Sequence, residues 1–247
     1  MDGSKNTTAL ILKREPYRED DSLVTVYTLD FGKLSLIARG TRKLRSKLAG
    51  HLEPLTLSEI MIISGKGLDY IGSALGREVY QPIRQDLNKL HYAGRAISIF
   101  SRLVKDSEPD RRLFFLIVDW LAALNSFEDL SSESGDLLLA FFALRLLGEL
   151  GYKPEMYKCL DCGKSVKPGR NYFNLLNGGV VCEACFLKES GRIGFQVTNI
   201  LTISDNCVKI VRFILENEEG RILRMKIDKK YLKELSFLVE SLLNFYF

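Results

Sequence analysis

The stretch SLVTVYTLDFGKLSLIA, residues 22–38, decides how the first third of the chain folds. Its two halves are rich in β-branched and aromatic residues that alternate with polar ones, and Asp30-Phe31-Gly32 lies between them. Two such runs joined by a short glycine-containing turn are typical of a β-hairpin. The stretch therefore predicts two antiparallel strands, Ser22–Leu29 and Lys33–Ala38.

Further strands are predicted on both sides of this hairpin. Thr8–Lys13 has strand character, and a second hairpin, Leu55–Ile63 and Leu68–Leu75, surrounds Gly65-Lys66-Gly67. Five short strands in one small unit indicate a small barrel, and the OB-type barrel is the commonest match to that count. We therefore expect residues 1–80 to form a five-stranded OB-type β-barrel.

After Pro82 the apolar residues follow helical spacing, which predicts an α+β protein of more than one domain. Inward-facing positions of the first helix are expected at Ile83, Leu87, Leu90, Ile97, Phe100 and Val104. Further helices are expected at Arg111–Leu124, at Gly135–Leu150, in two segments over Val197–Glu216, and from Asp228 to the end. The Gly135–Leu150 helix is apolar nearly all round and should be central. Residues 81–247 are thus expected to form a helical domain.

Four cysteines interrupt this helical part as two pairs, Cys159-Leu-Asp-Cys162 and Cys182-Glu-Ala-Cys185, with 19 residues between the pairs. The spacing is that of a structural zinc site, and the glycines at 178 and 179 predict a hairpin that brings the second pair back to the first. We therefore expect an inserted four-cysteine zinc module at 155–190, called the cysteine module below. A redox or disulfide role is the alternative. A catalytic zinc would need a histidine or glutamate ligand, and neither histidine of the chain is near the quartet in sequence.

Composition places the chain among ordinary globular proteins. It has 247 residues, 46 % hydrophobic and 27 % charged, with a net charge of +4. The first residues lack the apolar stretch of a secretory peptide, and the longest apolar run, Leu137–Leu144, is too short to cross a membrane. With cysteines spaced for a metal, these features predict a cytoplasmic protein without a membrane role.

The positive charge is concentrated in two segments. Between Asp30 and Glu53 there is no acidic residue. The cations of this first segment are Lys33, Arg39, Arg42, Lys43, Arg45 and Lys47. We expect most of them on a mobile loop between the third and fourth strands, where they would contact nucleic-acid phosphates without reading sequence. A merely solvated loop is the alternative. The second basic segment comprises Arg221, Arg224, Lys226, Lys229, Lys230 and Lys233, and a solvated helix face is the more favoured interpretation there.

Several motifs resemble a known family. REPYREDDSL at 14–23, TLDFGK at 28–33 and ARGTRKLRSKL at 38–48 resemble the N-terminal region of bacterial RecO, the recombination mediators of DNA repair. LLGELGY at 146–152, followed by a Cys-x-x-Cys pair, is similar to the entry into that family's zinc module. The order of parts, a barrel and then a helical body with a cysteine insertion, also agrees.

The resemblance implies a function. RecO-like proteins bind single- and double-stranded DNA, anneal complementary strands, and contact the C-terminal tail of single-strand-binding protein. With RecR they help load RecA onto coated strands, so RecA is an indirect partner. They are not enzymes, and they work in the cytoplasm at the nucleoid. The family's basic barrel surface corresponds to the six cations of the first segment, and the zinc, Zn²⁺, is structural. A zinc-ribbon RNA-binding or transcription accessory protein is the alternative, and a zinc hydrolase is a third reading.

Overall fold

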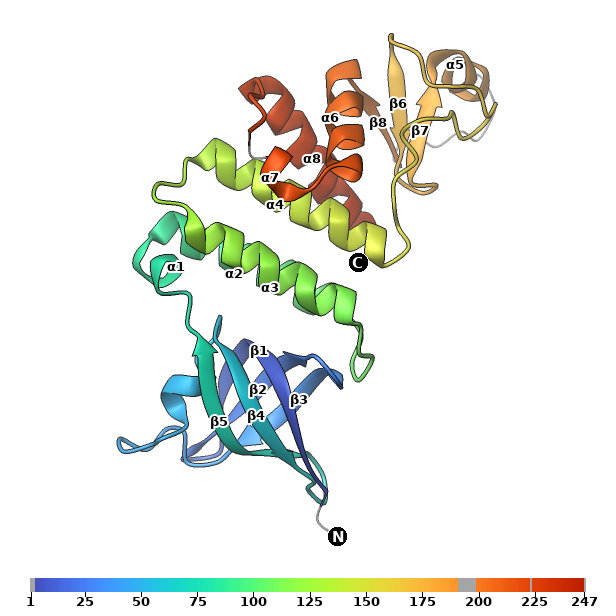
Figure 1. Ribbon diagram of the computed structural model, residues 1–247. Coiled ribbons are helices and arrows are strands. Elements are labelled where there is room, and N and C mark those ends of the chain that lie inside the picture. The colour runs from blue at the N-terminus through green and yellow to red at the C-terminus, as the bar shows by residue number, and fades with distance from the viewer. Residues whose placement is uncertain (1–2, 191–198, 223, 247) are drawn as a thin grey trace. The chain divides into compact units, whose positions relative to one another are not determined.

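The structure is a computed structural model that describes residues 3–190, 199–222 and 224–246 (Figure 1). It divides into two compact units, Met1–Glu128 and Asp129–Phe247. The strands of the first unit end at residue 78, a few residues before the change to helix that the sequence predicts after Pro82, and three helices complete that unit. The domain boundaries of 1–80 and 81–247 stay a prediction.

Unit 1 contains a closed five-stranded barrel with strand order β1-β2-β3-β5-β4, and pairing of β1 with β4 closes it. The strands are β1 (Ser4–Tyr17), β2 (Asp21–Thr28), β3 (Gly32–Ala38), β4 (Leu57–Ile63) and β5 (Tyr70–Glu78). Neighbours pair antiparallel except β3 and β5, which meet in parallel where Ile37 faces Tyr70. Five strands closed in this way confirm the OB-type barrel.

The barrel core follows from the alternation of the strands. Every second residue points inward, so Val24 and Val26 of β2 face Ile60 and Ile62 of β4 in one buried cluster. At the β2–β3 turn, Gly32 has a φ of 69°, and a Cβ there would lie 2.5 Å from backbone atoms of Glu108. Only glycine meets both conditions, because other residues rarely adopt that φ and have no room for the side chain.

Three helices follow the barrel in the same unit: α1 (Gln81–Gln85), α2 (Leu87–Leu103) and α3 (Arg111–Ser126). The carboxylates of Asp86 and Asp110 accept backbone N–H bonds at the starts of α2 and α3, which caps both helices. Tyr27 of β2 is fully buried, and its ring centroid lies 4.8 Å from that of Phe100 in α2. Barrel and helices therefore share apolar contacts within this unit.

The inward face expected for the first helix is partly wrong. Leu87 is 85 % exposed and Leu90 is 39 % exposed, whereas Lys89 is 3 % exposed. Helical spacing counted from Ile83 does not hold beyond Asp86, because the chain leaves helical geometry there, with φ −120° and ψ 118°. A new helix starts there with a different rotation, so its buried stripe runs through Lys89, Ala93, Ala96 and Phe100.

Unit 2 is built around one helix. The helices here are α4 (Ser132–Glu149), α5 (Glu183–Ser190), α6 (Asp205–Glu216), α7 (Glu219–Ile222) and α8 (Lys229–Tyr246). Helix α4 packs against α6, α7 and α8, and its residues from Leu137 to Leu144 are all buried. The prediction of a central helix that is apolar on nearly every side is confirmed.

The same unit holds a three-stranded antiparallel sheet with order β7-β6-β8. Its strands are β6 (Asn171–Asn174), β7 (Gly179–Cys182) and β8 (Ile200–Ile203). The helical segment expected from Val197 to Ser204 is wrong for 200–203, and residues 197 and 198 lie outside the described part. Leu201 pairs with Phe173 in the ladder, and this partner is distant in sequence, so local periodicity could not reveal it.

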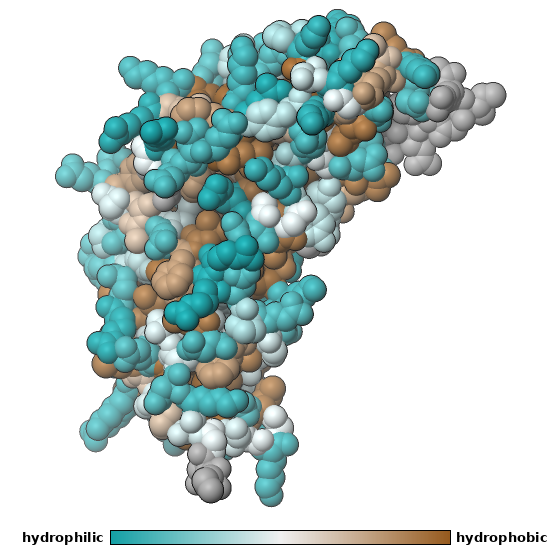
Figure 2. Space-filling view, turned by 45° about the vertical axis from the view of Figure 1, so that its right-hand side comes forward, coloured by the Kyte–Doolittle hydropathy of each residue, from teal (hydrophilic) through white to brown (hydrophobic). Residues whose placement is uncertain are grey.

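Polar residues cover most of the face in view in Figure 2, with apolar residues gathered in smaller patches between them. No helix formed by the described residues combines the length and the apolar character that crossing a membrane requires.

Candidate nucleic-acid interface and metal centre

The segment that joins β3 to β4 begins with residues 39–47, the basic loop. Its first half is tied to the start of β2. The Gly40 N–H donates to Asp21 Oδ1 at 2.9 Å, and the Thr41 hydroxyl donates to Ser22 Oγ at 2.8 Å. Thr41 and Ser22 are 3 % and 2 % exposed. The expectation of a mobile loop therefore needs correction, because buried hydrogen bonds hold this half against the barrel.

Two cations of the loop reach the turn between β1 and β2. Arg42 Nη1 donates to the backbone oxygens of Arg18 and Glu19 at 3.2 and 2.9 Å, while Lys43 Nζ lies 3.4 Å from Asp20 Oδ2. Carbonyl oxygens carry no net charge, so Arg42 keeps its positive charge, whereas that of Lys43 is partly balanced. Arg18 is exposed on the same turn. Arg18 lies outside the basic segment that the sequence indicates, although the register of β1, β2 and β3 places its turn beside the loop.

Three cations of the loop have no carboxylate partner in the described part of the chain: Arg39, Arg45 and Lys47. Arg39 lies over the ring of Tyr70, with its guanidinium carbon 4.4 Å from the ring centroid. Arg45 and Lys47 are exposed, and Leu44 between the cations is fully exposed. The loop therefore offers uncompensated positive charge with an apolar and an aromatic contact beside it.

Lys33 is not brought to this loop. It stands near the start of β3, where Nζ donates to Ser101 O at 2.9 Å and lies 3.0 Å from Asp106 Oδ1. Its side chain is 17 % exposed. Lys33 therefore joins the barrel to the segment around the end of α2, and a phosphate would have to displace both contacts to reach it.

Some cations of the second basic segment contact other side chains. Lys229 Nζ lies 2.5 Å from Glu133 Oε1, and this hydrogen bond is the largest of several contacts, with a backbone N–H and Ser132, that lower the pKa of Glu133 to about 2. Arg221 Nη1 donates to Asn217 Oδ1 at 3.2 Å. Both contacts are exposed, as the favoured interpretation of a solvated face predicts.

The four cysteines meet in unit 2. Their Sγ atoms all lie within 4.8 Å of one another, and those of Cys162 and Cys182 are 4.0 Å apart. The first pair sits on a tight turn in which the Gly163 N–H donates to Cys159 O at 2.9 Å, with a φ of 69° at Gly163. Cys182 ends β7 and Cys185 lies in the first turn of α5. The hairpin expected at 177–179 is confirmed, and it returns the second pair to the first.

The surroundings of Cys159 favour the thiolate form of its sulfur. Cys159 is 2 % exposed, and burial opposes its ionisation. Backbone N–H groups of Cys162, Cys182 and Asp161 nevertheless outweigh this effect and lower the pKa of Cys159 to about 7. A hydrogen bond with the Cys182 sulfur raises the pKa of Cys185 to about 12. Four sulfur ligands at these distances fit a tetrahedral metal ion, with every position filled by protein.

No disulfide links these cysteines: all five are free thiols. Cys207 lies on α6, away from the cluster, and is fully buried as expected. Desolvation raises its pKa to about 12, so this thiol belongs to the core.

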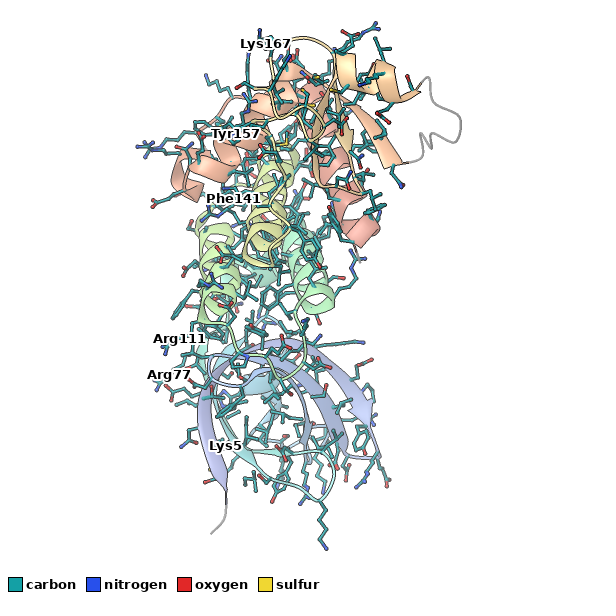
Figure 3. All side chains as sticks on the ribbon, turned by 90° about the vertical axis from the view of Figure 1, so that its right-hand side faces the viewer. Lys5, Arg77, Arg111, Phe141, Tyr157 and Lys167 are labelled. Carbon is teal, nitrogen blue, oxygen red and sulfur yellow. The ribbon has the colours of Figure 1, made fainter. Side chains whose placement is uncertain are left out.

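Contacts with α6 fix the cysteine module within unit 2. Arg212 Nε donates to Met156 O at 2.9 Å, and its guanidinium lies over the ring of Tyr157, which Figure 3 labels. The Tyr157 hydroxyl also donates to Glu216. The ring of Tyr172 on β6 stacks on that of Phe186 in α5 at a centroid distance of 3.6 Å. The module is thus attached by polar and aromatic contacts as well as by the sheet.

Comparison with known proteins shows which family has this arrangement of domains. A family model described as "Recombination protein O N terminal" matches residues 1–80, and one described as "Recombination protein O C terminal" matches residues 84–247. The chain is 31 % identical to the DNA repair protein RecO of Dehalococcoides mccartyi strain CBDB1, covering 97 % of this chain and 89 % of that protein. It is 28 % identical to the DNA repair protein RecO of Desulforamulus reducens, covering 96 % and 88 %. The matches cover the barrel, the helical body and the cysteine module together, and the chain therefore belongs to the RecO family of DNA repair proteins.

Proposed function

We propose that this protein is a DNA-binding recombination mediator that binds single and double strands and anneals complementary ones. The observation that carries the proposal is the basic loop, whose uncompensated cations project from backbone tied to an OB-type barrel. Lys and Arg bind phosphates by charge and release counterions, which gives affinity without sequence preference. OB barrels commonly present such surfaces to nucleic acid.

The proposed phosphate-binding set differs from the one that the sequence predicts at two positions. Arg39, Arg45 and Lys47 carry the free charge, and Arg42 and Lys43 lie beside them on the same loop. We include Arg18, which lies on the neighbouring turn. We exclude Lys33, because its ammonium group is bonded to Ser101 O and paired with Asp106. Leu44 and Tyr70 supply contact area for bases, which is the second element that single-strand binders use.

We propose that the cysteine cluster binds one structural Zn²⁺. The donors fit that ion, because four thiolates satisfy a tetrahedral zinc and leave no position open for substrate. When bound, the ion would fix the turn at 159–163 against β7 and α5, and its ligation energy would stabilise the module. The same closed donor set argues against a zinc hydrolase, so the chain would act by binding rather than by bond-making chemistry.

Membership of the RecO family also supports a proposal about binding partners. We propose that the protein works with RecR, contacts the C-terminal tail of single-strand-binding protein, and so promotes the loading of RecA. Its place would be the cytoplasm, at the nucleoid. The alternative of an RNA or transcription accessory protein loses its support, because both family models and the relatives point to DNA repair.

The decisive experiment is annealing of complementary labelled DNA strands by the zinc-loaded protein, with bare strands and with strands coated by single-strand-binding protein. Faster annealing in both cases is expected. Annealing of bare strands only would refute the mediator role, and no acceleration in either case would refute the proposal as a whole. RNA strands of the same sequence test for the accessory role.

A further inference from the structure

Two arginine–tyrosine pairs lie beside the basic loop. The guanidinium carbon of Arg39 is 4.4 Å from the centroid of the Tyr70 ring, and that of Arg18 is 5.2 Å from the centroid of the Tyr17 ring. Cations within about 6 Å of a ring centroid are attracted to the face of the ring. Both arginines are exposed and both tyrosines are half-buried. Each pair therefore forms a stacking surface that solvent reaches.

The first pair lies on the outer face of the barrel. Ala38 and Ile71 belong to the buried barrel cluster. Successive side chains along a strand point to opposite faces, so the next residue, Arg39, and the preceding one, Tyr70, point outward. The pairing of Ile37 with Tyr70 brings the end of β3 and the start of β5 together. Strand register thus explains why Arg39 reaches the Tyr70 ring.

The second pair lies on the same face. Tyr17 pairs with Asp21 across β1 and β2, and the next residue of β2, Ser22, is buried, so Tyr17 and Asp21 point outward. The Asp21 carboxylate accepts the Gly40 N–H, which joins this turn to the basic loop. Arg18 has a φ of 56°, a conformation uncommon outside glycine. Such backbone strain is often found at binding sites.

The charge of this surface stays positive when its carboxylates are counted. The β1–β2 turn, the basic loop and residues 66–70 together hold seven cations and four carboxylates. The carboxylates are Glu19, Asp20, Asp21 and Asp69. The net positive charge attracts the phosphates of a strand, and the two arginine–tyrosine pairs are then within the area that the strand covers.

The other aromatic residues of the barrel strands and turns are placed differently. Tyr27 is fully buried, with its ring centroid 4.8 Å from that of Phe100. Phe31 lies at the opposite end of β2 and packs against the barrel cluster, with Lys5 Nζ 5.1 Å from its ring centroid. Tyr17 and Tyr70 are therefore the rings that accompany the basic loop.

We propose that this surface stacks two unpaired bases of a single strand, one on the Tyr17–Arg18 pair and one on the Tyr70–Arg39 pair. The inference rests on the proposed function and deepens it, because it makes the single strand the preferred form of DNA. Base–aromatic stacking tolerates any sequence, since every base has a π face, and arginine adds a cation–π contribution. A duplex offers phosphates to the same cations, but its bases are paired and stacked within the helix.

The test compares full-length zinc-loaded protein with a variant that carries Tyr17→Leu and Tyr70→Leu. Fluorescence anisotropy follows three labelled probes of equal length: a single strand, the same strand without its bases, and a duplex. At about tenfold for each stacked base, wild-type protein should bind the complete strand about 100-fold more tightly than the base-free strand. The variant should lose this factor. Its affinity for the base-free strand and the duplex should stay as in wild type.

Two controls separate stacking from structural support. Tyr17→Phe with Tyr70→Phe keeps both rings and should retain the preference for the complete strand. Phe31→Leu removes a half-buried ring that contacts a cation at the other end of β2, and it should leave all three affinities unchanged. In wild-type protein, a strand with 5-iodouracil should form photochemical cross-links to Tyr17 and Tyr70, read by mass spectrometry.

The outcomes distinguish this inference from the proposed function. Equal affinity of wild-type protein for the complete and the base-free strand would overturn the inference, and so would a leucine variant that keeps the preference. A leucine variant that binds the base-free strand as poorly as the complete one loses would also overturn it, because the rings would then only support the basic loop. Failure of wild-type protein to bind any of the three probes would instead refute the proposed function.

Discussion

Replacing Arg39, Arg45 and Lys47 together by glutamine should weaken DNA binding by an amount that the structure allows us to estimate. Five exposed cations of the basic loop and the adjoining β1–β2 turn have no carboxylate partner among the described residues: these three with Arg18 and Arg42. Each neutralised phosphate of a single strand contributes about 0.7 to the slope of log affinity against log salt. Five contacts give a slope of about −3.5, and the two that remain give about −1.4.

The difference of about 2.1 in slope corresponds to roughly a 100-fold loss of affinity near 0.1 M salt, or about 2.8 kcal/mol. The fold should survive, because Arg45 and Lys47 are exposed and Arg39 gives up only an exposed contact with Tyr70. The assay is a titration of a labelled single strand, followed by fluorescence anisotropy at several salt concentrations. Strands of unrelated sequence should all lose the same factor.

The matched control replaces Lys13, Arg77 and Lys105 by glutamine. These cations belong to the same unit, and each is paired with a carboxylate, at 2.8, 2.6 and 3.8 Å. The net charge changes by the same amount, but the slope should barely move. If the loop variant kept the wild-type slope, or if the control lost as much affinity, the assignment of the basic loop as the phosphate site would be wrong.

Three further outcomes follow from single positions. Cys182→Ser should abolish stoichiometric zinc in elemental analysis and lower the melting temperature, yet leave single-strand binding by the basic loop intact; full zinc content would contradict the four-sulfur site. Gly32→Ala should cost about 2 kcal/mol or more in urea unfolding, because of its φ of 69° and the Glu108 backbone 2.5 Å away, whereas Gly94→Ala, with open space around it, should be neutral or stabilising. The pKa of the Cys207 thiol is raised from 9.0 to about 12. Folding therefore favours its neutral form, and the stability gained is complete below about pH 9 and is lost as pH rises toward 12. A thiol reagent at pH 8 should therefore leave Cys207 unlabelled in the folded protein, where this thiol is fully buried, and label it in denaturant; labelling of Cys207 in the folded protein would contradict this account.

The sequence by itself determined the features that depend on neighbours along the chain. The alternation of apolar and polar residues over 22–38, with a glycine-containing turn between the two halves, is enough to predict two strands. The apolar run at 137–144 predicts a central helix, since such a surface has to be covered on every side. The spacing of Cys159, Cys162, Cys182 and Cys185 predicts a metal site, because two turns of fixed geometry can meet at one tetrahedral ion.

Tertiary structure alone decided what depends on distant partners. Residues 200–203 form a strand because β6 offers an open edge, although their own pattern also suits a helix. The exposure of Leu87 and Leu90 follows from the restart of the helix at Asp86, and Lys33 is engaged because α2 ends beside β3. The sequence shows which residues are charged. Whether a cationic side chain contacts a carbonyl, an aromatic ring or a carboxylate depends on groups that only the folded chain brings close to it. Lysine and arginine side chains therefore make a structural contact at Lys33 and carry free charge at Arg45 and Lys47.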